Sequence, residues 1–234
     1  MSDLASALAI GAEEQSLVRE LKAGSETAFA QLIAQYSRPV YSLIARSLRD
    51  PADAADVTQE VFVKVFRNIH SFHGEASLRT WIYRIAVHEA SNQRRWWSRH
   101  KKQELTLDDS RENEEGESLC LADMLATGEA SPFDNVARAQ LRERVEAALH
   151  KIPEVFRTAV VLREIEGFAY EEIAEILETN VGTVKSRLMR GRAALREALR
   201  EGTAAKDGIH SSATEQKNRR PRTSITAKEG VVLS

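Results

Sequence analysis

Apolar residues recur with helical spacing along most of this chain, and no segment shows the strict alternation of a strand. The clearest stripe is Val57, Val61, Phe62, Val65, Phe66 and Ile69. Asp50 is placed to cap this helix, with Pro51 at its first position. Aromatic residues make up only 6% of the chain, which favours helices over a turn-rich β-sandwich. We therefore predict an all-α fold.

Breaks in the helical pattern divide the chain. Helices are expected from Glu13 to Arg49 with a break at Gly24, and Ser77 is expected to cap a long helix that reaches Lys102. We predict two small helical domains joined by a flexible acidic linker. The expected parts are an N-terminal segment (1–24), a first domain (25–102), the linker (103–135), a helix-turn-helix domain (136–200) and a disordered tail (201–234).

Charge is distributed unevenly along the chain, although the net charge is only −2. Residues 84–102 hold six bases and one acid, and residues 181–200 hold the same numbers. Between them, residues 103–135 hold ten acids and one base. Two basic segments, each attached to a helical unit, favour two surfaces for a polyanion over simple solvated helix faces.

The segment 169–194, AYEEIAEILETNVGTVKSRLMRGRAA, follows the pattern of a helix-turn-helix. Ile173, Ala174, Ile176 and Leu177 are expected to bury one face of its first helix, and Val184 and Leu188 to point inward from the second. The residues left on or near the open face are Thr183, Lys185, Ser186, Arg187, Arg190 and Arg192. A major groove admits one α-helix, and Lys or Arg can read guanine edges there. DNA binding is therefore favoured over a helix hairpin that only carries surface arginines.

Three stretches together resemble one family. DVTQEVFVKVFRNI (56–69), SLRTWIYRIAVHEASNQRR (77–95) and the segment 152–195 are similar to the bacterial extracytoplasmic-function (ECF) sigma factors. This resemblance implies that the first domain docks on core RNA polymerase and opens the minus-ten promoter element. It implies that the second domain binds the minus-thirty-five element as duplex DNA. It also implies an anti-sigma partner. We expect no cofactor.

The resemblance extends to individual residues. For docking on core polymerase it implies Asp56, Gln59, Glu60 and Lys64. For the minus-ten element it implies Phe72, His73, Ser77, Arg84, His88, Asn92, Arg94 and Arg95. For the minus-thirty-five element it implies the open-face residues of the helix-turn-helix.

The chain departs from the family pattern at three positions. His88 stands where relatives often carry Asn, Ala169 where a capping Ser or Thr is common, and Glu178 at a turn position that is often Gly. Trp96 and Trp97 suit either stacking on DNA or packing at a core or interdomain seam.

Other function classes are disfavoured. No apolar run reaches the roughly 18–20 residues that span a bilayer, and the N-terminus has no basic start of a secretory signal, so we expect a cytoplasmic protein. Cys120 is the only cysteine, and His70 and His73 beside Glu75 make only a weak metal-ligand pattern. We expect no enzyme activity. The alternative is a helix-turn-helix regulator that acts without docking on core polymerase.

Overall fold

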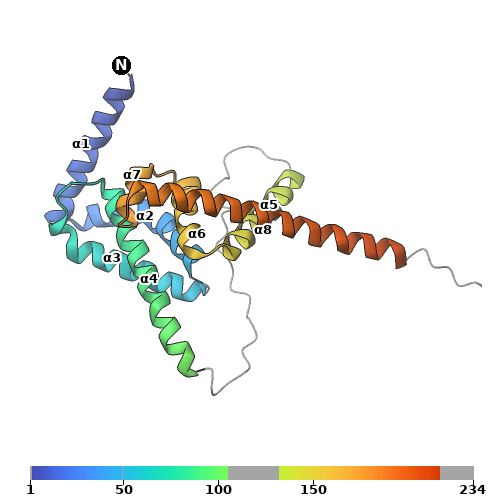
Figure 1. The fold of residues 1–234 in the computed structure, drawn as a ribbon. Coiled ribbons are helices and arrows are strands. Elements are labelled where there is room, and N and C mark those ends of the chain that lie inside the picture. Colours follow the sequence, from blue (N-terminus) through green and yellow to red (C-terminus); the bar gives the residue numbers. More distant parts are fainter. Residues whose placement is uncertain (1, 49, 105–131, 217–234) are drawn as a thin grey trace, which may run out of the picture.

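The computed structural model describes residues 2–48, 50–104 and 132–216, and within them every regular element is a helix (Figure 1). The first part contains α1 (Ser2–Lys22), α2 (Glu26–Ser47), α3 (Pro51–Asn68), the 3-10 turn η1 (Ile69–Ser71) and α4 (Leu78–Glu104). The second contains α5 (Pro132–Lys151), α6 (Glu154–Val160), the π-helical turn η3 (Val161–Ile165), α7 (Tyr170–Ile176) and α8 (Val181–Gln216). The prediction of an all-α fold is confirmed.

Helix starts in the first part follow local capping rules. The carboxylate of Asp50 accepts a hydrogen bond from the backbone N–H of Ala52 at 2.8 Å, with Pro51 at the first helical position. The hydroxyl of Ser77 accepts from the N–H of Thr80 at 3.1 Å. Gly24, with φ +77°, makes the left-handed turn between α1 and α2. These starts and this break lie where the sequence predicted them.

The predicted boundaries in the second half need correction. Residues 201–216 were expected to be disordered, but α8 continues to Gln216, and no proline interrupts the helix in this stretch. Residues 132–135 were assigned to the linker, but they form the first turn of α5. Most of the expected linker (105–131) and residues 217–234 of the expected tail lie outside the described residues.

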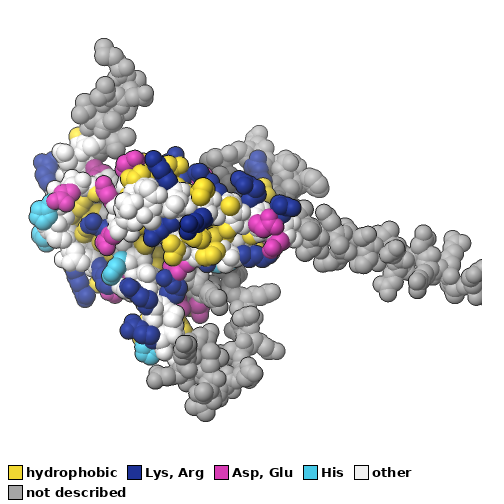
Figure 2. Space-filling model, in the orientation of Figure 1, with side chains coloured by type: hydrophobic (Ala, Val, Ile, Leu, Met, Phe, Trp, Pro, Cys, Tyr) yellow, Lys and Arg dark blue, Asp and Glu magenta, His cyan; other side chains and the backbone are white. Residues whose placement is uncertain are grey.

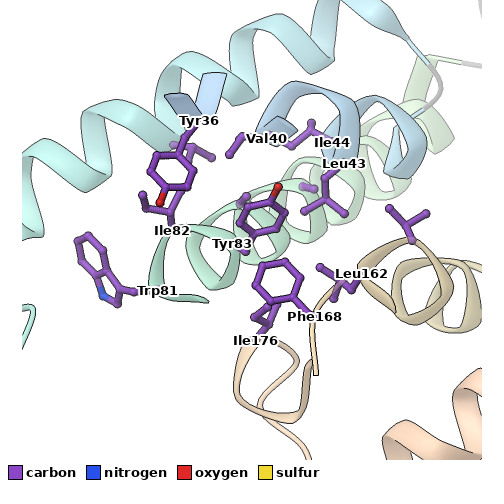
Figure 3. Packing of buried hydrophobic residues seen from close by; sticks show 14 of the residues in the cluster. Tyr36, Val40, Leu43, Ile44, Trp81, Ile82, Tyr83, Leu162, Phe168 and Ile176 are labelled. Carbon is purple, nitrogen blue, oxygen red and sulfur yellow. The ribbon is translucent and has the colours of Figure 1, made fainter. Parts of the chain in front are cut away.

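The two helical units pack directly against each other. α4 contacts α7, and α2 contacts α5 and α6. Figure 3 shows Tyr83 of α4 meeting Phe168, which precedes α7, and their rings cross edge to face with centroids 4.7 Å apart. Both side chains are buried, so one continuous core joins the units that the sequence divides into two domains.

Candidate functional site

An acidic groove runs between α3 and α4. Asp56, Gln59 and Glu60 are exposed on α3, on the side opposite the buried Val57, Val61 and Val65 stripe. Asp56 and Glu60 line a groove of about 590 Å³ together with the α4 side chains Glu89, Asn92, Gln93, Trp96 and Arg99. These three residues are therefore exposed on one face of α3, which agrees with their i, i+3, i+4 spacing on a helix.

Lys64 has a different position from the other residues predicted for polymerase docking. Its Nζ lies 2.5 Å from a carboxylate oxygen of Glu89 on α4 and 3.9 Å from one of Glu60. Burial raises the pKa of Glu89, but hydrogen bonds from Lys64 and His88 outweigh burial and hold it below its usual value. Lys64 therefore ties α3 to α4 across one end of the groove.

A second hollow lies at the loop between η1 and α4. The loop residues 71–76, with Trp81 and Arg84 of α4, line a pocket of about 350 Å³. Phe72 is buried with its ring centroid 5.4 Å from that of Trp81, whereas His73 is exposed and Gly74 turns the loop with φ +78°. One further wall of this pocket is Glu175 of α7. The pocket thus combines aromatic walls with one exposed cation, Arg84.

The residues predicted for the minus-ten element do not form one cluster. Phe72, His73 and Arg84 line the loop pocket, and Ser77 caps α4 beside it. Asn92 lines the acidic groove instead, where it contacts His88 at 3.1 Å and accepts a hydrogen bond from Arg95 at 2.5 Å.

Arg94 and Trp97 face the second helical unit. Arg94 forms an ion pair with Glu154 of α6, and burial together with the positive charges of Arg157 and Arg95 lowers its pKa. Trp97 lines a cavity of about 770 Å³ between the units, so it belongs to the interdomain seam. Its neighbour Trp96 is 46% exposed and stacks on His100 with centroids 4.4 Å apart.

The helix-turn-helix is formed by α7 and the start of α8. Ile173, Ala174 and Ile176 are buried and Leu177 is half-buried, and Val184 and Leu188 of α8 are buried against them, as predicted. Ala169 offers no side-chain cap, and its own N–H donates to the carboxylate of Glu172 at 2.7 Å. Glu178 has φ +47°, a left-handed conformation that explains why glycine is common at this turn position.

Basic and hydroxyl side chains lie along the first four turns of α8. Figure 2 shows several Lys and Arg side chains on this face of the molecule, with hydrophobic side chains between them. Lys185 and Arg190 are exposed, and the guanidinium of Arg190 lies 6.0 Å from the ring centre of Phe156. Thr183, Ser186 and Arg187 are half-buried. Arg192 differs from these residues because it donates to a carboxylate oxygen of Glu164 at 2.6 and 2.9 Å.

Sequence reasoning missed the polar contacts between the two units. The hydroxyl of Tyr83 donates to the Glu166 carboxylate, and Arg79 donates to the backbone carbonyl of the same residue, both at 2.5 Å. The Arg79 guanidinium also lies 4.0 Å from the ring centre of Phe168. Further along, Arg46 pairs with Glu146 at 2.7 Å. No local pattern marks these residues, because each partner lies more than 80 positions away in the chain.

The buried carboxyl of Glu166 is the centre of these contacts. Its side chain is only 7% exposed. Burial raises its pKa above the usual value, although the hydrogen bond from Tyr83 and the charges of Arg79 and Arg46 act in the opposite direction. Burial and the nearby Glu166 charge likewise raise the pKa of Tyr83, so its hydroxyl stays protonated as a donor.

Two other kinds of site do not occur in these residues. Among the side chains that the structure describes, no group of three or more His, Cys, Asp or Glu could hold a metal ion. In those same ranges, no helix combines the length and apolar character needed to cross a bilayer.

Comparisons with family models and with known proteins all point to the same family. Residues 32–100 match the family model for Sigma-70 region 2, and residues 142–195 match the model for Sigma-70, region 4. The chain is 35% identical over 192 residues to the RNA polymerase sigma-H factor of Pseudomonas aeruginosa, covering 80% of this chain and 94% of that protein. It is 38% identical over 180 residues to the ECF RNA polymerase sigma-E factor of Haemophilus influenzae, covering 76% and 91%.

Among solved structures, the fold is similar to that of the sigma factor RpoE of Bartonella quintana, solved with the anti-sigma factor NepR. The TM-score is 0.56 at 22% identity, covering 74% of this chain and 96% of the other. Both sigma regions match in the expected order, and the relatives are matched over nearly their whole length. The chain therefore belongs to the ECF family of bacterial RNA polymerase sigma factors.

Proposed function

We propose that this sigma factor uses three separate surfaces to bring core RNA polymerase to its promoters and to help melt the DNA. The acidic face of α3 docks on the polymerase, the loop pocket before α4 takes an unstacked base of the minus-ten element, and α8 reads the minus-thirty-five element. The observation that carries this assignment is the order of these surfaces, which lie within the two matched regions. A helix-turn-helix regulator without polymerase docking would leave the match over residues 32–100 unexplained.

The polymerase-docking face consists of Asp56, Gln59 and Glu60. All three are exposed, and Asp56 and Glu60 line the groove, so they can meet a basic protein surface without rearrangement. Lys64 has a different role: its ion pair with Glu89 joins α3 to α4 and so sets the width of this groove.

The loop pocket suits a single flipped base. Phe72 and Trp81 provide aromatic walls, His73 offers hydrogen-bonding atoms at the rim, and Arg84 offers a positive charge for a neighbouring phosphate. Stacking on aromatic side chains contributes about 1–3 kcal/mol per base, which is comparable to the cost of unstacking it. Asn92, which lines the groove beside α4, and Arg95, which donates to it, contact the DNA next to this base. Arg94 becomes available to DNA only when it leaves its ion pair with Glu154.

The open face of α8 suits a major groove. Lys185 and Arg190 are exposed there and are the candidates for base contact, with Thr183, Ser186 and Arg187 beside them for phosphates. Arg192 can bind a DNA phosphate only after it leaves its ion pair with Glu164.

Both DNA surfaces can be used on one promoter only if the two units separate. Glu175 of the helix-turn-helix lines the same pocket as Phe72, so the two surfaces are adjacent in this structure. The centres of the minus-ten and minus-thirty-five elements are about 25 base pairs, or about 85 Å of B-form DNA, apart. The closed arrangement is therefore a state of the protein before promoter binding.

We further assign the protein to the cytoplasm, where the polymerase acts, with no catalytic activity of its own. An anti-sigma protein is the expected regulatory partner, by analogy with sigma factors such as the Bartonella quintana protein bound to NepR.

The test is transcription from a promoter library by purified core polymerase, with and without this protein. The proposal expects a small set of promoters to be transcribed only when the protein is present, and co-purification with core polymerase when DNA is absent. Binding to promoter DNA without association with core polymerase would instead support the regulator.

A further inference from the structure

The loop that forms the base pocket has little structure of its own. Residues 73–77 between η1 and α4 belong to no helix, and His73, Gly74 and Glu75 are exposed. Its walls are nevertheless fixed at both ends, because Phe72 is buried before it and Leu78 is buried after it.

Helix α1 supplies a polar contact at each of these ends. The Nζ of Lys22 donates to the backbone carbonyl of Phe72 at 2.6 Å. The Oε1 of Glu14 accepts from the backbone N–H of Leu78, the first residue of α4, at 2.7 Å. The two residues are eight positions apart on one helix, so their Cα atoms lie about 12 Å apart along its axis. Both contacts are part-buried and charge-assisted.

The contact from Glu14 also completes the cap of α4. The first N–H groups of a helix have no partner within it. Ser77 takes the N–H of Thr80, and Glu14 takes that of Leu78, so two of these groups are satisfied, one of them from a distant helix. Helix α1 is itself anchored, since Leu21 is buried and Leu17 and Val18 pack against the core.

We propose that Glu14 and Lys22 are positioning residues for minus-ten recognition: they hold the entry and exit of the loop so that the pocket is formed before DNA arrives. The ligand of this pocket is an unstacked base of the non-template strand. This inference rests on the proposed function of the loop. A pocket held open in advance avoids the entropic cost of ordering the loop at the moment of binding.

The experiment uses holoenzyme assembled from core polymerase and the full-length protein. The probe is a promoter selected from the library, with 2-aminopurine placed in turn at each non-template position of the minus-ten element, because its fluorescence rises when the base unstacks. Lys22→Met and Glu14→Met remove the contacts while keeping the length of the side chains. Lys22→Arg and Glu14→Gln retain a donor and an acceptor, and Glu13→Gln changes an exposed neighbour on the same helix.

We expect each Met variant to weaken base capture roughly 10- to 150-fold, the range for loss of one charge-assisted hydrogen bond. Affinity for core polymerase and the helical content measured by circular dichroism should stay unchanged. The Arg and Gln variants should recover most of the fluorescence rise, and Glu13→Gln should match the wild type.

Met variants that capture the base as well as the wild type would overturn the inference. So would Met variants that lose helical content and polymerase affinity to the same extent as base capture. A wild-type protein that supports promoter-specific transcription without any fluorescence rise would also overturn it. Failure of the proposed function is a different result, in which the wild type supports no promoter-specific transcription.

Discussion

Glu178 holds a backbone conformation that is costly for any residue with a side chain. Its φ of +47° is the left-handed turn between α7 and α8, and the position lies outside the buried face of the helix-turn-helix. Replacement by Gly removes the steric penalty of the Cβ, which is roughly 1–2 kcal/mol for this region. Glycine also gains freedom in the unfolded chain, which offsets part of this gain.

We therefore predict that Glu178→Gly raises the free energy of unfolding by about 0.5–1 kcal/mol. The measurement is thermal or urea unfolding followed by circular dichroism. Glu197→Gly is the matched control, since Glu197 is an exposed position inside α8, and there Gly should cost about 1 kcal/mol. Equal effects of the two substitutions would contradict the strain at Glu178.

Alanine substitutions of Arg190 and Arg192 can distinguish a base contact from a phosphate contact. Arg190 is exposed on the open face of α8, whereas Arg192 is held by Glu164. If Arg190 reads a base edge, Arg190→Ala should cost roughly 1–3 kcal/mol and relax the preference at one promoter position. Arg192→Ala should weaken binding about equally on all sequences and reduce its salt dependence.

The measurement is binding of holoenzyme to a panel of single-base variants of the minus-thirty-five element at two salt concentrations. A uniform loss for Arg190→Ala across the panel would assign Arg190 to phosphate contact and leave Lys185 as the candidate for base readout.

At the scale of elements, α6 and α8 cross at a point where only glycine fits. A Cβ built on Gly191 would lie 2.6 Å from a side-chain carbon of Val160 and 3.1 Å from the carbonyl oxygen of Phe156. The second of these is backbone and cannot turn away. Gly191 is therefore the contact that lets the recognition helix lie close to the rest of its domain.

We predict that Gly191→Ala lowers the free energy of unfolding by about 1–3 kcal/mol, the usual range for overpacking a core. Gly11→Ala is the matched control in α1, because a Cβ at Gly11 would meet nothing within 4 Å and Ala favours a helix. Chemical unfolding of the two variants checks this, and the idea fails if Gly191→Ala is as stable as Gly11→Ala.

The acidic face of α3 can be tested as one element. Asp56→Arg combined with Glu60→Arg should abolish binding to core polymerase, because the reversal places like charges against the basic surface expected on the partner. Both residues are exposed, so helical content should be preserved. Titration of labelled protein against core polymerase measures the effect, with Arg67→Glu, an exposed change on the same helix, as the control. Unchanged affinity of the double variant would refute the docking assignment.

Elements were predictable from the sequence where their causes are local. The cap at Asp50, the cap at Ser77 and the break at Gly24 depend on residues within three positions of one another, and all three are confirmed. The stripe of buried Val on α3 and the buried face of α7 follow from helical periodicity alone. The extension of α8 beyond Arg200 was missed because its sequence is polar and carries no apolar period.

The candidate site was predicted less completely, because its geometry depends on pairs far apart in the chain. Helical spacing placed Asp56 and Glu60 on one exposed face, but it could not show that Lys64 pairs with Glu89 or that Arg94 pairs with Glu154. The contacts of Glu14 and Lys22 with the loop likewise join residues 64 and 50 positions apart.

At the scale of the whole molecule, the closed arrangement depends on a small polar cluster beside the shared core. Arg79 donates to the carbonyl of Glu166, lies 3.7 Å from its carboxylate and covers the ring of Phe168. Arg79 thus joins three interactions across the interface, and it is 39% exposed, so its loss should not disturb either unit internally.

We predict that Arg79→Ala opens the molecule at neutral pH. Loss of its hydrogen bond and its cation–π contact should weaken docking of the two units by roughly 1–3 kcal/mol. Small-angle X-ray scattering should show a larger radius of gyration than for the wild type, with Arg67→Ala, an exposed residue on α3, as the control. A radius equal to that of the wild type would show that the apolar core alone keeps the units together.

Acidification should act in the opposite direction from Arg79→Ala. Burial raises the pKa of Glu166 in the closed molecule, so the closed form binds more protons than an open form in which this carboxyl is hydrated and has its ordinary pKa. The closed form is therefore favoured as the pH falls to and below the raised pKa of Glu166, and this contribution is lost as the pH rises through that pKa.

Scattering of Arg79→Ala as a function of pH measures the effect. The radius of gyration should decrease on acidification, and adding Glu166→Gln, which has no titrating group at this position, should remove the dependence. A dependence that persists in the double variant would assign the proton to another group.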